Sequence, residues 1–92
     1  MIKVENWDRY AETVQQTLTA ISIVIQNTED ERIKEYMRII SHYLVRGVEY
    51  AIDTRVKSAF RKCRKLDEYN DFILLAYIDY CELFNWITFT EG

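Results

Sequence analysis

Apolar residues recur every three or four positions along most of this chain, which is the spacing of one face of an α-helix. The first such run covers residues 7–27 and predicts a helix that buries Trp7, Ala11, Val14, Leu18, Ile21 and Ile25. Asn6 is the expected N-cap, because its side-chain oxygen can accept a hydrogen bond from an unpaired amide of the first turn.

A second helix is expected to start at Thr28, since Thr28 and Glu31 have the spacing of a capping box. Its buried face would carry Ile33, Met37, Ile40, Leu44, Val48, Ala51, Ile52, Val56, Ala59, Phe60 and Cys63. Gly47 has no turn-forming neighbours, so we expect one continuous or kinked helix from Thr28 to about Arg64, roughly 55 Å long. The alternative is a break near Gly47 or Asp53, which would give a four-helix bundle.

A third helix is expected from Leu66 or Asp67 to about Ile87, with Asp67 as its possible N-cap. Its buried face would carry Tyr69, Ile73, Ala76, Tyr80, Leu83 and Ile87. Residues 88–92 should form a frayed tail. The predicted fold class is therefore all-α: an antiparallel bundle of three long helices, possibly four, in a single domain spanning residues 1–92. Aspartate in place of Ile40 or Leu75 is expected to unfold the protein, because both residues are assigned to the core.

The composition agrees with a helical protein. There is no proline and only two glycines, so the chain lacks the turn residues that sheet proteins need. No apolar run reaches the ~18 residues of a membrane span, and residues 1–8 lack a signal-peptide pattern. We therefore expect a cytoplasmic protein without membrane contact, in which Cys63 and Cys81 are free thiols.

The second and third helices carry more apolar residues than three helices of this length can enclose. Such an excess predicts contact with another chain, either in a homodimer or with a different protein. Because aromatic side chains are common at interface centres, the expected partner-binding residues are Tyr43, Tyr50, Tyr77, Phe84 and Trp86. The alternative is a compact monomer, with the aromatic rings half-buried on its surface or kept for a heterologous target.

Basic residues are concentrated in one stretch, although the whole chain has a net charge of −3. The stretch contains Arg55, Lys57, Arg61, Lys62, Arg64 and Lys65 and no acidic residue. The favoured interpretation is structural, because cations offset the partial negative charge at a helix C-terminus. There are two functional alternatives: these residues bind an acidic protein surface, or they bind the phosphates of a nucleic acid.

Candidate chemistry is sparse. The single histidine and the two cysteines do not form a metal-ligand set of known spacing, and there is no glycine-rich phosphate loop. We expect no metal and no cofactor. Arg38 followed by His42 resembles the arginine–histidine motif of the HEPN ribonucleases, which have four to six residues between the two where this chain has three. That resemblance would imply RNA cleavage by Arg38 and His42.

The function expected from the sequence is therefore non-enzymatic protein–protein interaction. The protein would be a small regulator or inhibitor, of the immunity, antitoxin or phage-encoded type, or a helical subunit of an assembly. Nucleic-acid binding through residues 55–65 is the alternative from a different class, and ribonuclease activity is the third.

Overall fold

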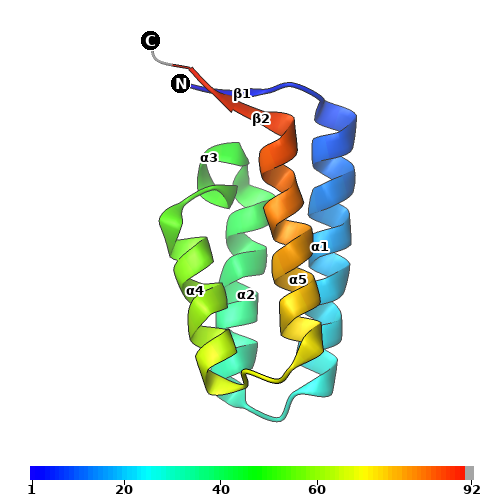
Figure 1. The fold of residues 1–92 in the computed structure, drawn as a ribbon, viewed down its shortest axis with the longest axis vertical. Coiled ribbons are helices and arrows are strands. Elements are labelled where there is room, and N and C mark those ends of the chain that lie inside the picture. The colour runs from blue at the N-terminus through cyan, green and yellow to red at the C-terminus, as the bar shows by residue number, and fades with distance from the viewer. Residues whose placement is uncertain (91–92) are drawn as a thin grey trace.

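Four helices pack side by side in an antiparallel bundle (Figure 1). The computed structural model describes residues 1–90. The long helices are α1 (Trp7–Asn27), α2 (Glu31–Arg46), α4 (Thr54–Leu66) and α5 (Asp71–Glu82). A single turn, α3 (Val48–Ala51), joins α2 to α4, and a 3₁₀ turn, η1 (Leu83–Trp86), extends α5. The all-α prediction is confirmed.

Each long helix has two neighbours in the bundle. Helix α1 contacts α2 and α5, and α4 contacts the same two helices. The helices therefore occupy the corners of a square. The side formed by α1 and α5 lies opposite the side formed by α2 and α4 (Figure 1).

The chain reverses direction between residues 47 and 53, so the expected continuous helix from Thr28 to Arg64 is wrong. The whole molecule is only 43 Å long. The alternative of a break near Gly47 or Asp53 is what the structure has, and both breaks occur. Gly47 has φ +139°, which side-chain-bearing residues rarely adopt, and Asp53 caps α4 by accepting from the Arg55 amide at 2.8 Å.

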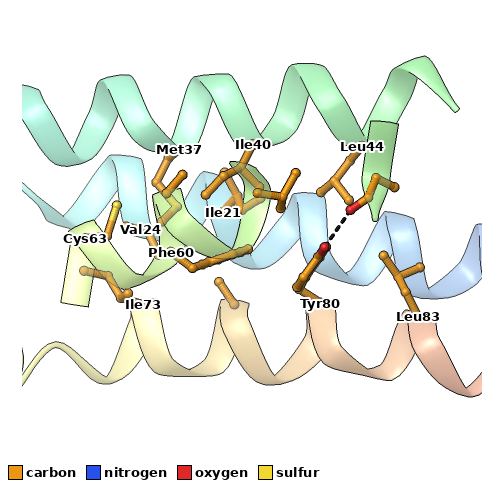
Figure 2. Packing of buried hydrophobic residues seen from close by; sticks show 14 of the residues in the cluster. Ile21, Val24, Met37, Ile40, Leu44, Phe60, Cys63, Ile73, Tyr80 and Leu83 are labelled. Atoms are coloured by element: carbon orange, nitrogen blue, oxygen red, sulfur yellow. Dashed lines mark hydrogen bonds between the residues drawn. The ribbon is translucent and has the colours of Figure 1, made fainter. Parts of the chain in front are cut away.

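The buried faces of α2, α4 and α5 agree with the apolar spacing of the sequence. Figure 2 shows Met37, Ile40, Phe60, Ile73 and Tyr80 meeting between these helices. Two assignments are wrong: Tyr69 is 89% exposed and Leu75 is 54% exposed. Tyr69 precedes α5, which begins only at Asp71, and Leu75 lies on the outer face of that helix.

Helix α1 buries a face that includes Ile21, as predicted, but is rotated so that the other predicted residues are at most partly buried. The predicted face contains Trp7 and Ala11, which are exposed, whereas Thr13 and Thr17 are buried. Their hydroxyls donate to the carbonyl oxygens of Arg9 and Thr13, each at 2.8 Å, so burying them leaves no unpaired donor. Because α1 packs against both α2 and α5, the centre of its contact lies between these helices, and the predicted apolar stripe becomes the flank toward α2.

Three of the predicted helix starts can be compared with the structure. Asn6 caps α1 as predicted, accepting from the Arg9 amide at 3.1 Å. The Thr28 capping box is wrong, because Asp30 caps α2 and the Thr28 hydroxyl accepts instead from the Asp30 amide. The start at Leu66 or Asp67 is also wrong, because Asn70 is the residue that caps α5.

The two ends of the chain form an antiparallel strand pair, β1 (Ile2–Val4) with β2 (Ile87–Phe89). The Met1 amino group donates to the Thr90 carbonyl oxygen and the Thr90 amide donates to that of Met1, both at 2.8 Å. The predicted frayed tail is therefore wrong for residues 88–90, and the rest of it lies outside the described residues. None of the described helices is long and apolar enough to cross a membrane.

Candidate interaction surfaces

Three of the aromatic residues predicted to bind a partner pack instead against other residues of the bundle. Tyr77 and Phe84 both pack against buried rings, with Tyr77 tilted 5.4 Å from Phe60 and Phe84 edge-on to Tyr80 at 5.6 Å. Trp86 donates through Nε1 to the Thr13 hydroxyl at 3.2 Å. All three predicted contact residues are only partly exposed and pack against the core.

The apolar residues that remain exposed on α5 are different ones. Phe72, Leu75 and Ile78 form a row along its outer face, 43–54% exposed. Beside this row, a groove of about 660 Å³ runs between α1 and α5. Its lining residues are Glu12, Gln15, Gln16, Thr19, Ala20, Ile23, Leu75 and Asp79. We call this surface the α1/α5 groove.

Every charged residue that lines the α1/α5 groove is acidic. Glu12 comes from α1 and Asp79 from α5. Partial burial raises the pKa of Asp79, and the nearby carboxylate of Glu82 raises it further. Glu12 is ion-paired with Arg9 at 3.7 Å, whereas Asp79 forms no salt bridge within residues 1–90. The groove therefore combines apolar contact area with one unpaired carboxylate, that of Asp79.

A second hollow, of about 460 Å³, lies near the other flank of α1 and is lined mainly by apolar residues. Trp7 and Val45 stand at its edge, and both are well exposed. No charged residue lines this hollow, so its shape alone does not distinguish one occupant from another.

The six predicted basic residues spread over the solvent-facing half of α4. The helix buries Val56, Ala59, Phe60 and Cys63, and the cations cover the remaining surface. Six of the chain's twelve basic residues and none of its fifteen acidic residues lie in α4, which gives this helix a charge of +6 against −9 for the rest. The negative net charge therefore hides a strong separation of charge.

Aromatic rings lie directly beside these cations, although they come from other helices. Lys62 lies over the ring of Tyr36 at 5.7 Å, Arg55 over Tyr43 at 5.9 Å, and Arg46 over Tyr50 at 4.6 Å. The first two pairs join α4 to α2, whereas the third joins Arg46 of α2 to Tyr50 of α3, whose ring packs edge-on against Tyr43 at 6.3 Å. We call these three pairs the basic–aromatic seam. Two predicted partner-binding residues, Tyr43 and Tyr50, belong to it. On the other flank of α4, Lys57 lies over Phe84 at 4.5 Å.

A cleft of about 380 Å³ opens at the end of the seam. It is lined by Arg32 and Tyr36 of α2 and by Lys62, Lys65 and Leu66 of α4. The sequence could not show this cleft, because Tyr36 and Lys62 lie 26 positions apart in the chain. The only local signal was the absence of acids from residues 54–66.

The predicted catalytic pair is not assembled into a pocket. Arg38 pairs with Glu35 at 3.8 Å, and the exposed His42 ring lies 3.5 Å from the Arg46 guanidinium. In the part of the chain that the structure describes, no group of three metal-ligating side chains comes together. Both cysteines are free thiols, and burial raises the pKa of Cys63 to about 12.

Comparison with known proteins gives no relative for this chain: no protein-family model, no curated protein and no solved structure matches it. Its function therefore has to be argued from the chemistry of the α1/α5 groove and of the basic–aromatic seam.

Proposed function

We propose that this protein acts by binding another protein, and that the α1/α5 groove receives an amphipathic helix of the partner with basic residues beside its apolar face. The observation that carries the proposal is the exposed row of Phe72, Leu75 and Ile78 beside the groove. An amphipathic helix binds such a groove by laying its own apolar face, with anchors at positions i, i+3, i+4 and i+7, against the exposed apolar residues. The protein would then be a small regulator, inhibitor or assembly subunit without catalytic activity.

The charge of the groove favours a basic partner. Glu12 and Asp79 are the charged lining residues, and Asp71 and Glu82 stand on the same outer side of α5. A lysine or arginine of the partner would neutralise Asp79, whose pKa is raised because it is partly buried beside Glu82. In a second copy of this chain the charged residues that line the groove are again Glu12 and Asp79, so the two-fold dimer considered from the sequence brings no basic residue of the groove opposite Asp79.

The test uses two labelled helical peptides of about 15 residues, with leucines along one face and either lysines or glutamates on the flanks. We expect the lysine peptide to bind and the glutamate peptide to bind far more weakly in fluorescence polarisation. Leu75→Asp should weaken binding of the lysine peptide at least about tenfold, because it removes an apolar anchor. Attraction between charges alone would predict the opposite, since Leu75→Asp adds a negative charge.

The matched control is Ile39→Asp. Ile39 lies on α2, away from the groove, and is 38% exposed, the same fraction as Ile23 within the groove. This variant should bind the lysine peptide like the wild type. Equal affinities of the Leu75→Asp and Ile39→Asp proteins, or equal affinities of the two peptides for the wild type, would contradict the proposal.

A further inference from the structure

On the opposite side of the bundle, we propose that the basic–aromatic seam and its cleft bind single-stranded nucleic acid. Such strands bind to surfaces that combine cations for the phosphates with aromatic rings on which unpaired bases stack. The seam has both, and it lies on the α2/α4 side of the molecule, separate from the α1/α5 groove.

The cations of the cleft are available to an incoming phosphate. In the structure of residues 1–90, Lys62 and Lys65 form no salt bridge. Asp30 and Asp53, beside the seam, are already occupied: each caps a helix and pairs with an arginine, Arg32 at 2.9 Å and Arg55 at 3.3 Å. Glu31 and Glu35, which flank Tyr36, are paired as well, with Lys34 at 3.3 Å and Arg38 at 3.8 Å. Because α4 itself contains no acid, its six cations are not offset by carboxylates of the same helix, although the chain as a whole is negative.

Tyr36 is the ring best placed for a base. Tyr36 lines the cleft together with Leu66. It also lines a separate, neighbouring hollow formed with Glu31, Arg32 and Glu35. Tyr36 is partly buried against the core, and it borders both hollows, while three cations, Arg32, Lys62 and Lys65, stand around the cleft. An apolar wall with cations at its rim suits a nucleotide, whose base is flat and whose phosphate is charged.

The length of the seam fits a short stretch of strand. Tyr36 and Tyr43 are two helical turns apart on the same side of α2, a distance of about 10 Å. Stacked nucleotides advance by ~3.4 Å each, so about three fit between the two rings. A purely acidic peptide would use the cations but would gain nothing from the rings, and this difference separates the two kinds of ligand.

The experiment measures binding of fluorescein-labelled oligo-dT and oligo-U of about ten nucleotides by anisotropy, with polyglutamate of equal length as the third probe. We expect both oligonucleotides to bind at low salt, with affinity falling as salt rises with a logarithmic slope of about −2 to −3, as for three or four phosphate contacts. The two oligonucleotides differ both in the 2′-hydroxyl of the sugar and in the C5-methyl group of the base, so a preference for one would show that at least one of these groups is contacted. Polyglutamate should bind far more weakly.

Two variants separate the contributions of charge and ring. Lys62→Glu with Lys65→Glu should abolish binding, whereas the control Lys3→Glu with Arg9→Glu has the same net charge and should bind within about threefold of the wild type, because both residues lie outside the seam. Tyr36→Leu should weaken binding about 5- to 100-fold and leave the salt slope unchanged, since a stacked base contributes no ion release.

Several outcomes would overturn the proposal. These are no binding of either oligonucleotide at low salt, equal losses in the two double-charge variants, and wild-type affinity of the Tyr36→Leu protein. Polyglutamate binding as tight as that of the oligonucleotides, with no effect of Tyr36→Leu, would instead assign the seam to acidic proteins. Circular dichroism and thermal melting confirm that each variant is folded before its binding is compared.

Discussion

The hydroxyl of Tyr80 donates a hydrogen bond of 2.6 Å to the carbonyl oxygen of Ala51, in the interior of the bundle (Figure 2). This bond ties α5 to the single turn α3, where the chain reverses between α2 and α4. Both residues are fully buried, so neither group can exchange the bond for one with water. Burial also raises the pKa of Tyr80, which keeps the phenol protonated and able to donate.

Tyr80→Phe is expected to lower the free energy of unfolding by about 1–3 kcal/mol, because it leaves the Ala51 carbonyl oxygen buried without this donor. Tyr10→Phe is the matched control: the buried Tyr10 hydroxyl has no hydrogen-bond partner among residues 1–90. Removing it should leave stability unchanged or raise it. Urea denaturation of the two variants checks this, and an equal loss in both would show that the Tyr80 bond is not stabilising.

Gly47→Ala is expected to destabilise the protein by about 1–3 kcal/mol, the cost of a side-chain-bearing residue held in a strained backbone conformation. No atom lies within 4 Å of the position that a Cβ would take, so the cost should come from the backbone and not from a clash. Gly47→Ser should therefore cost the same as Gly47→Ala in thermal or urea denaturation. A wild-type midpoint for both would mean that the chain does not need a positive φ to leave α2.

Ile40→Asp and Leu75→Asp should now have opposite outcomes. Ile40 is fully buried, so an aspartate there would place a charge in the core and should unfold the protein. Leu75→Asp should cost about 1 kcal/mol or less, because more than half of that side chain is already in water. The helical signal in circular dichroism and its melting temperature distinguish the two. Unfolding by Leu75→Asp would contradict the outward orientation of this face of α5.

The raised pKa of Asp79 predicts how the stability of the protein depends on pH. Its pKa is raised in the folded protein, so the folded state holds this proton more tightly than the unfolded chain does. Its ionisation therefore destabilises the fold as the pH rises from the unfolded value of about 3.9 through the raised folded value. Asp79→Asn is expected to melt higher than the wild type at about pH 7, with the difference vanishing near pH 3, where Asp79 is neutral in both states.

Glu82→Gln serves as the companion variant, because the Glu82 carboxylate contributes to raising the pKa of Asp79. In that background the stabilisation by Asp79→Asn at about pH 7 should be smaller than in the wild type. A difference between Asp79→Asn and wild type that grows toward low pH would reverse the sign expected here.

Much of the core could be predicted from the sequence. The residues buried by α2, α4 and α5 follow the spacing of three and four, since burial of one helix face depends on the local periodicity of the chain. The same spacing runs through Gly47 and Asp53 without a shift, although α2 and α4 are separate helices that face one common core. Periodicity therefore identified the buried residues and could not show that the chain turns back between them.

The sequence by itself determined the helical class, most of the inward-facing residues and the acid-free stretch of α4, because each of these depends on residues close together in the chain. Tertiary structure alone decided the burial of Thr13 and Thr17, the pairing of β1 with β2, and the placement of Lys62 over Tyr36. Some of these features join residues that are distant in sequence, and the others depend on how α1 is rotated against its two neighbours. The local spacing of apolar residues carries no information about long-range contacts or about helix rotation. Both candidate binding surfaces therefore became visible only in the packed structure.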